Sequence, residues 1–559
     1  MAIGAKTNFE ILFSDTPDSL GPIKISIFDK NIVVNIENRD PIISTFRPDE
    51  LERTVKSLER KLISNSVDPI SSQKLIIFIT QELLKKVEHD QQSMLSNGVS
   101  IKDTQRIIDE IEKDKSTVGE ISLENWEKTR KEKYQQLRKT VHNHIPSIWL
   151  PLEFILSVKS ILNIADVTLP FAGIILGAPS THKTVGLTMM QIWPQTFYTD
   201  SFTSKALVSH STAVTKEQLA DIDMLPRWKN KSVLLPELAP IFTAKDDDLT
   251  QLLGILTRVL DGHGYESDSG AHGHRGYREK IMFVLVGASV DIPYKVHKVL
   301  GYLGPKLYFL RLPKNCKTEE ERLKESREDF GQKEGAIKQA LFDYLKWLEI
   351  RPDMAIDADS GLPKIRWDFS KDDEDSERYI IRLAELLSHL RGVATTWHTK
   401  DTQGSDYAYT KPIIEDPSRA ITQLKNLARG HALSCARNFI KKEDISIVVK
   451  TVLSTASVER VFIFDELLKN EGILTTSQVE KSLKISPPTA RRTMTELDVL
   501  GIVNILEPDG ELYTEKRIVL KPEFNWFLTP EFNELREEFV PMDNKEELDE
   551  QGWSGKHEN

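Results

Sequence analysis

The chain has 559 residues, 28% of them charged, and a formal net charge of −11 at pH 7. The length predicts three or four domains, since a typical domain has about 100–200 residues. The negative charge excludes a general attraction to nucleic acid, so binding of DNA would require a local basic face. Cys316 and Cys435 lack metal-ligand spacing and are expected to be reduced thiols. With no secretory signal and no apolar run long enough to cross a bilayer, we expect a cytoplasmic protein that does not bind membranes.

Residues 1–145 are expected to form a small α+β domain. Apolar alternation over 23–27 and 32–36 flanks a polar turn, which predicts a hairpin. Two helical segments follow, and then a long charged helix over 103–141. Its carboxyl end is basic, which favours a solvated face; a nucleic-acid contact is the alternative.

An apolar strand beginning at Phe171 leads into Gly177-Ala-Pro-Ser-Thr-His-Lys-Thr184, which opens a helix. This layout is typical of a phosphate-binding loop, in which backbone N–H groups surround the phosphates. Lys183 would contact the β and γ oxygens, and Thr184 would bind Mg²⁺. The sequence thus predicts an ATP·Mg²⁺ site formed by Gly177, Ser180, Thr181, His182, Lys183 and Thr184; an accidental match is the alternative.

His182 stands where the usual loop has a second glycine. Only glycine takes positive φ freely, so histidine should restrict the loop wherever such an angle is needed. We expect His182 either to weaken phosphate binding or to add a hydrogen-bond donor to it.

A second apolar strand, Ser232–Leu235, is followed by Pro236 and Glu237. In phosphate-loop ATPases this strand commonly ends Asp-Glu, where the aspartate holds the Mg²⁺ shell and the glutamate polarises the attacking water. Here Pro236 replaces the aspartate and Glu237 is the candidate catalytic group, with an ordinary surface glutamate as the alternative. We therefore expect nucleotide binding to be more secure than fast hydrolysis.

Short strands and helices alternate as far as Leu312, which predicts an α/β fold with a parallel sheet. The runs 235–240, 246–261 and 281–289 resemble the AAA+ ATPases, closest to the branch of the minichromosome-maintenance helicases and the bacterial enhancer-binding activators. The resemblance implies that Ser289 is the polar sensor of the nucleotide. It also implies an arginine finger within 303–313, for which Lys306 and Arg311 are both candidates.

The segment 417–437, followed by Lys442-Glu-Asp-Ile445, is similar to the lid helices of the minichromosome-maintenance group. The resemblance implies that Arg419 senses the nucleotide; a surface helix residue is the alternative. It covers about residues 170–453 and leaves the first 150 residues unassigned. Such ATPases usually act as hexamers with the site at a subunit interface, so the resemblance implies a homo-oligomer.

A glycine- and histidine-rich segment spans 261–277. Its histidines and acidic residues (His263, His272, His274, Glu266 and Asp268) admit a metal site, although their spacing lacks the paired ligands of a strong zinc signature. In the family, a mobile loop facing the channel of a ring lies here, so the resemblance implies DNA contacts by His272, His274, Arg275 and Tyr277. A structural glycine-rich loop is the alternative.

The region 456–530 is expected to form a winged helix, with helices over 461–470, 476–483 and 487–500 and a hairpin after Gly501. An apolar face on the third helix leaves a basic and hydroxyl face for DNA, and Arg517 lies on the wing. The candidate DNA contacts are Thr489, Arg491, Arg492, Thr495 and Arg517. Protein binding is the alternative.

The expected domains are 1–145 (α+β), 146–315 (phosphate-loop core), 316–455 (helical insertion and lid), 456–530 (winged helix) and 531–559 (acidic tail). The leading hypothesis is an AAA+-type ATPase acting on DNA as a helicase, translocase or remodeller, in replication or a mobile element. Two alternatives stay open. One is an ATP-gated DNA-binding regulator or scaffold that hydrolyses poorly, and the other is a protein-remodelling ATPase.

Overall fold

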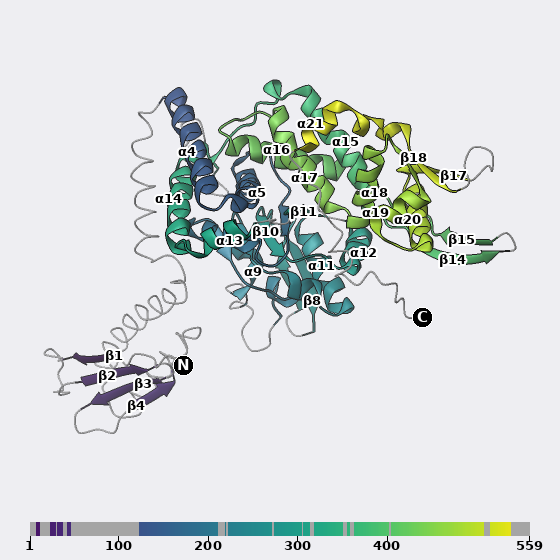
Figure 1. Cartoon of the computed structure of the whole chain (residues 1–559). Coiled ribbons are helices and arrows are strands. Elements are labelled where there is room, and N and C mark those ends of the chain that lie inside the picture. Colours follow the sequence, from purple (N-terminus) through teal and green to yellow (C-terminus); the bar gives the residue numbers. More distant parts are fainter. Residues whose placement is uncertain are drawn as a thin grey trace. The chain divides into compact units, whose positions relative to one another are not determined.

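The computed structural model describes four strands near the start of the chain and most residues after position 121 (Figure 1). The described residues are 7–11, 23–28, 31–36, 42–45, 122–210, 219, 222–270, 273–304, 306–313, 318–349, 355–357, 363–401, 404–507 and 515–537. The chain divides into two compact units, residues 1–109 and 110–559. Most of the expected acidic tail falls outside the described residues.

The first unit contains a four-stranded antiparallel sheet in the order β1-β2-β3-β4. Its strands are β1 (Thr7–Ile11), β2 (Ile23–Phe28), β3 (Asn31–Ile36) and β4 (Ile42–Thr45). The predicted hairpin is confirmed, because β2 pairs with β3 from Ile23↔Ile36 to Phe28↔Asn31. The two helical segments predicted after it, and the first part of the long charged helix, lie outside the described residues.

The second unit is built on a five-stranded parallel sheet in the order β11-β5-β10-β7-β6. Its strands are β5 (Phe171–Leu176), β6 (Thr196–Tyr198), β7 (Ser232–Leu235), β10 (Val284–Ser289) and β11 (Leu307–Arg311). All residues of β5, β7, β10 and β11 are buried, as expected for parallel strands covered on both faces. The predicted α/β class and parallel sheet are confirmed.

One face of this sheet is covered by the helices that follow β6, β7 and β10. They are α7 (Ser204–Leu207), α9 (Met224–Trp228), α10 (Ala239–Phe242), α11 (Asp246–Val259) and α12 (Tyr294–Leu303). Alternate residues of β5 (Ala172, Ile174 and Leu176) share one apolar core with leucines spaced along α11 (Leu249, Leu252, Leu253 and Leu256). Three aspartates in the first turn of α11 favour a helix start there.

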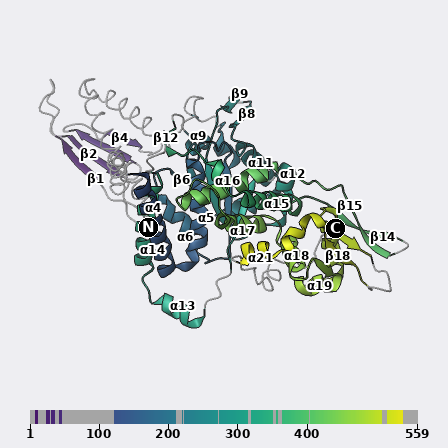
Figure 2. The same ribbon diagram turned by 90° about the horizontal axis from the view of Figure 1, so that it is seen from above.

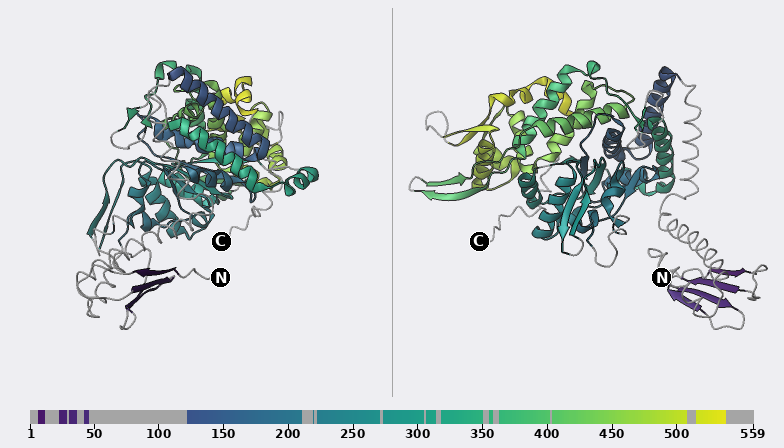
Figure 3. Two further views of the ribbon diagram at one scale, coloured as in Figure 1. Left: turned by 90° about the vertical axis from the view of Figure 1, so that its left-hand side faces the viewer. Right: turned by 180° about the vertical axis from the view of Figure 1, so that it is seen from behind.

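The other face of the sheet packs on α5 (Trp149–Ser160), which α16 (Ser418–Ser434) covers in turn. Gly173 of β5 makes room for the Phe154 ring, since a Cβ there would lie 2.6 Å from its Cζ. Helix α17 (Ile445–Thr455) lies along β11, and α15 (Glu374–Leu390) packs on α16 and α17. In Figure 3, α15, α16 and α17 are green ribbons beside the blue-to-teal sheet, and α5 is blue.

Helix α4 (Leu123–His144) belongs to the second unit, so the boundary between the units falls well before the expected position 145. It packs along α14 (Phe330–Glu349). The buried guanidinium of Arg130 donates to the carbonyl oxygen of Leu433, and the Tyr134 ring packs edge-on against Trp149 at 5.6 Å between centroids. Through these contacts the basic end of the charged helix packs against α5, α14 and α16.

Short elements complete the helical region: α6 (Lys183–Met189), α13 (Glu319–Ser326), and the paired strands β12 (Ala355–Ile356) with β13 (Pro363–Lys364) and β14 (Thr396–Asp401) with β15 (Gly404–Tyr409). Figure 2 shows the β14–β15 hairpin at the same end as the carboxy-terminal helices. Within the described ranges, no helix is both long and apolar enough to cross a membrane.

The carboxy-terminal module combines three helices with a small antiparallel sheet in the order β16-β18-β17. Its elements are α18 (Val458–Lys469), β16 (Ile473–Thr475), α19 (Thr476–Leu483), α20 (Pro487–Val499), β17 (Val503–Leu506) and β18 (Arg517–Leu520), followed by α21 (Pro530–Glu537). Thr475 and Gln478 form a capping box that starts α19. The predicted helices lie within a few residues of these bounds, whereas β16 was not predicted.

Candidate functional site

The loop after β5 lies at the carboxyl edge of the sheet. Strand β5 stands between β10 and β11, where the order of strands reverses, which is where open α/β sheets commonly bind ligands. The Gly177 N–H donates to the Ser289 carbonyl oxygen at 3.2 Å. A Cβ at Gly177 would lie 2.7 Å from the Thr181 hydroxyl oxygen, which itself donates to Ala178 O at 2.9 Å. A side chain at position 177 would therefore displace the Thr181 hydroxyl from this hydrogen bond.

His182 adopts the left-handed conformation that the sequence predicts to be difficult, with φ 60° and ψ 16°. Ser180 also has a positive φ, 66°. Contacts on two sides hold the His182 ring: Nδ1 lies 2.9 Å from the Ser147 hydroxyl oxygen, and the ring stacks on Phe330 at 6.1 Å between centroids. Side-chain contacts thus offset the strain of about 1–2 kcal/mol that a non-glycine residue carries in this region.

Lys183 is the first residue of α6 and is 6% exposed. Burial lowers the pKa of its ammonium group, and the nearby Glu237 carboxylate opposes that shift. Its Nζ makes a long contact of 3.5 Å with the Ala178 carbonyl oxygen. A lysine that is removed from water and weakly bonded retains the capacity to bind an anion at this edge.

Glu237 follows β7 and is partly buried. Its Oε1 accepts from the Ala239 N–H at 2.9 Å, at the start of α10. The next residue, Leu238, donates its N–H to the Ala288 carbonyl oxygen at 2.8 Å, so Glu237 lies at the same edge of the sheet as Ser289 and the loop. Thr184, also partly buried, follows Lys183, so one carboxylate and one hydroxyl are available here to a hydrated Mg²⁺.

Ser289 and Arg311 end the two strands beside β5, and both are in register with Leu176. Ser289 is fully buried and donates to the Asp291 carbonyl oxygen at 3.1 Å. Arg311 Nη1 lies 3.0 Å from Asp291 Oδ1. The structure thus brings Ser289 and Arg311 to the loop and adds Asp291, which sequence reasoning missed because no spacing rule marks it.

Lys306 and Arg419 do not lie at the loop. Both bind the carboxylate of Asp261. Lys306 Nζ is 2.6 Å from Asp261 Oδ1, and Arg419 Nη2 binds the same oxygen. Burial alone would raise the pKa of Asp261, but the two cations lower it. Asp261 precedes Gly262, whose Cβ position is 2.9 Å from Thr168 O, just before β5.

This position is at the amino edge of the sheet, one strand length of about 20 Å from the loop. Within one chain Arg419 therefore lies away from the loop, and its expected role as a nucleotide sensor stays a prediction. Of the two finger candidates, Arg311 lies at the loop edge and Lys306 at the opposite edge.

The glycine- and histidine-rich segment forms a hairpin of β8 (Tyr265–Ser269) and β9 (Gly273–Tyr277). Arg275 is not an exposed DNA contact, since its side chain is 6% exposed and Nη2 lies 2.8 Å from the fully buried Asp223. The Tyr277 hydroxyl donates to the same carboxylate at 2.8 Å. The hairpin is therefore anchored to the segment preceding α9.

His274 is the exposed histidine of β9, and its ring nitrogens lie 3.2 Å from Glu266 and 3.1 Å from Asp268. These hydrogen bonds raise the pKa of His274. His272 lies outside the described residues. No group of three or more histidine, cysteine or acidic side chains in the described part of the chain is arranged to hold a metal ion.

The candidate DNA contacts on α20 differ in their exposure to solvent. Arg491 is exposed, and Thr489 and Arg492 are partly exposed, with Arg492 Nε 3.8 Å from Glu496 Oε1. Thr495 does not face outward: it is 8% exposed and its hydroxyl donates to the Arg491 carbonyl oxygen. Arg517 is partly buried on β18, paired across from Leu506.

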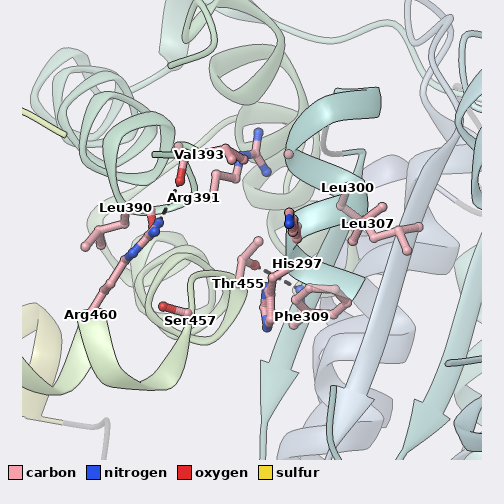
Figure 4. A pocket seen from close by; sticks show the side chains of 13 residues that line it. His297, Leu300, Leu307, Phe309, Leu390, Arg391, Val393, Thr455, Ser457 and Arg460 are labelled. Atoms are coloured by element: carbon pink, nitrogen blue, oxygen red, sulfur yellow. Dashed lines mark hydrogen bonds between the residues drawn. The ribbon is translucent and has the colours of Figure 1, made fainter. Parts of the chain in front are cut away.

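A small cavity of about 30 Å³ lies between β11, α12 and α18 (Figure 4). His297 lies in its wall, where burial, with help from the charge of Arg311, lowers its pKa to about 4. Arg460 of α18 donates to the Leu390 and Gly392 carbonyl oxygens at 2.8 and 2.7 Å. The cavity is thus bordered both by the edge strand β11 and by the first helix of the carboxy-terminal module.

No known protein-family model matches the chain, and no curated protein matches it significantly.

Proposed function

We propose that the second unit is an AAA+-type ATPase that binds ATP·Mg²⁺ on the loop 177–184. The observation that carries this proposal is the convergence of Lys183, Glu237, Ser289 and Arg311 at the carboxyl edge, around the loop that follows a central strand. Cationic, hydroxyl and carboxylate groups of this kind are what phosphoryl transfer requires, since its catalysis is mainly positioning and charge stabilisation.

In this proposal each group has a distinct task. Lys183 binds the β and γ phosphate oxygens, which replace its weak contact with Ala178 O. Thr184 holds Mg²⁺, which neutralises phosphate charge, and Glu237 orients the attacking water after leaving the Ala239 N–H. Ser289 and the Arg311–Asp291 pair respond to the γ phosphate. Pro236 supplies no metal ligand at the usual position, which favours slow hydrolysis.

The carboxy-terminal module supports the second part of the proposal, that the protein acts on DNA. Three helices and a three-stranded sheet have the composition of a winged helix, and Arg491 is exposed on its third helix. The fuller version of the proposal is a helicase, translocase or remodeller that works as a homo-oligomer, for example a hexamer. Pro236 favours one alternative, a DNA-binding regulator gated by ATP.

The test begins with nucleotide binding, measured as fluorescence of a labelled ATP analogue in the presence of Mg²⁺. We expect Lys183→Ala to weaken binding about 10- to 100-fold, the cost of a lost charge-assisted contact. Lys139→Ala, at an exposed position of α4, should leave binding unchanged. Glu237→Gln should retain binding and lose hydrolysis. Equal binding by wild type and Lys183→Ala would refute the site.

DNA binding is tested separately by fluorescence anisotropy at two salt concentrations. Arg491→Ala should weaken binding and reduce its salt dependence, whereas Arg322→Ala, an exposed arginine on α13, should not. A wild-type protein without salt-dependent DNA affinity would leave the ATPase proposal standing and remove DNA as its substrate, favouring a protein-remodelling role.

A further inference from the structure

A cluster of ionisable side chains surrounds the carboxyl end of α16, away from the loop. His431 and Cys435 lie one helical turn apart, with Nε2 and Sγ separated by 3.9 Å. Cys435 is a free thiol and is partly exposed. A thiol, an imidazole and a carboxylate in contact form the arrangement that activates sulfur nucleophiles.

The His431 ring is oriented by Asp444. Nδ1 lies 2.7 Å from Asp444 Oδ1, and Asp444 is fully buried. Arg437 donates to both Asp444 oxygens at 2.8 Å, and the Lys441 N–H donates at 2.8 Å. His431 and Arg437 lower the pKa of Asp444 although burial alone would raise it. An ionised Asp444 only accepts, so Nδ1 carries a proton and Nε2 faces the sulfur.

Other elements contribute charges to the same cluster. Glu153 of α5 lies with Oε1 3.6 Å from His431 Nε2, and the Tyr134 hydroxyl of α4 lies 3.4 Å from Glu153 Oε1. The further titratable groups that influence these residues are Arg138, Tyr344 and Lys450. Burial disfavours both the protonated His431 and the ionised Cys435. Cys435, Asp444 and Glu153 nevertheless raise the pKa of His431 well above its usual value. In turn, His431 lowers the pKa of Cys435.

We propose that Cys435 is a modification site, a thiolate held against the His431 imidazolium that reacts with hydroperoxides and other small electrophiles. With a hydroperoxide, the sulfur attacks the nearer oxygen, so an S–O bond forms and the O–O bond breaks. The leaving oxygen takes the proton of His431 Nε2. Sulfur is oxidised to a sulfenic acid, and the peroxide is reduced to water or an alcohol.

A modified Cys435 would disturb contacts that hold the helical layer together. The Tyr344 hydroxyl donates to Ser434 O at 2.6 Å, and Arg130 donates to Leu433 O, so α14 and α4 are both bound to the last turn of α16. An adduct on Cys435, the next residue along the chain, would lie close to both of these contacts. The inference concerns chemistry at sulfur and does not depend on nucleotide binding.

The experiment uses the full chain with Cys316→Ser, which leaves Cys435 as its one thiol. Alkylation by iodoacetamide, which forms an S–C bond and releases iodide, is followed by mass spectrometry between pH 6 and 8. The alkylation rate of an ordinary thiol, with a pKa of about 8.5, falls roughly 80-fold when the pH is lowered from 8 to 6. We expect the alkylation rate of Cys435 in the native protein to fall less than about threefold over this range. In guanidinium chloride, the rate should fall as it does for an ordinary thiol.

His431→Gln should restore the ordinary pH profile in the native state, and a dimedone adduct should appear at Cys435 after exposure to hydrogen peroxide. The comparison of native and denatured protein keeps the test decisive even if this variant does not fold. A native Cys435 that reacts no faster than the denatured chain at pH 6 would overturn the proposal.

Discussion

Gly430 of α16 lies directly against the backbone of Ser157 in α5, and an ideal Cβ at Gly430 would stand 2.1 Å from the Ser157 carbonyl oxygen. Because the obstacle is backbone in another helix, no side-chain rotation removes the clash. The contact sets the distance between α16 and α5, and α5 in turn supports the strand that leads to the phosphate loop.

Gly430→Ala should therefore destabilise the second unit by about 1–3 kcal/mol, the usual cost of overpacking. Gly254→Ala in α11 is a matched control, because a Cβ there meets nothing within 4 Å. That change should stabilise by up to about 1 kcal/mol through helix propensity. Urea denaturation measures both, and equal effects of the two substitutions would contradict the close helix contact.

His182→Gly and His182→Ala separate backbone strain from ring contacts. Both variants lose the contacts with Ser147 and Phe330, but only alanine keeps the strain at φ 60°. We expect the alanine variant to be less stable than the glycine variant by about 1 kcal/mol. If urea denaturation ranks alanine equal to or above glycine, the left-handed conformation is not retained.

Arg275 is predicted to stabilise the fold instead of binding DNA. Arg275→Ala leaves the buried Asp223 without its cation, which should cost about 3 kcal/mol of the free energy of unfolding. His274→Ala, on the exposed side of the same strand, should leave stability unchanged. Thermal denaturation distinguishes them; a stable Arg275→Ala protein that has lost DNA affinity would reverse the assignment.

The buried His297 predicts a loss of stability in acid. Its pKa is lowered from 6.5 to about 4. Between these values the unfolded chain binds a proton that the native state does not, so stability is complete above pH 6.5 and falls as the pH decreases towards 4. Between pH 7 and 5 the contribution is about 2 kcal/mol.

His431 acts in the opposite sense, because its raised pKa gives stability that is complete below pH 6.5 and is lost as the pH rises towards its folded-state pKa.

The acid-side loss attributed to His297 is tested by substitution. His297→Gln should remove this loss, while His142→Gln on the exposed side of α4 should not. Urea denaturation at pH 7 and 5 gives the comparison. An unchanged acid-side loss in His297→Gln would exclude this histidine as its cause.

The parts of the site that could be predicted from sequence are those fixed locally. Phe171–Leu176 is a continuous apolar run, and the loop after it carries its own glycine, lysine and threonine. The pairing of Lys306 and Arg419 with Asp261 was not predictable, because 158 residues separate Arg419 from its partner. Arg275 likewise finds Asp223 52 residues away.

Thr495 shows a second limit, since helical periodicity identifies an apolar face but not what covers the remaining surface. Neighbouring elements enclose α20 on more than one side, so Thr493 and Thr495 are buried together with Met494. A polar residue off the apolar face is therefore not necessarily exposed.

Strand β11 forms one margin of the parallel sheet, and its outward N–H groups are already occupied. Phe309 N and Arg311 N donate to the hydroxyl groups of Thr455 and Ser454, both at 2.9 Å. An incoming strand would have to displace α17 before it could extend the sheet there. Helix α17 thus blocks edge-to-edge aggregation at β11. Copies of this chain therefore cannot associate by forming a continuous sheet across this strand.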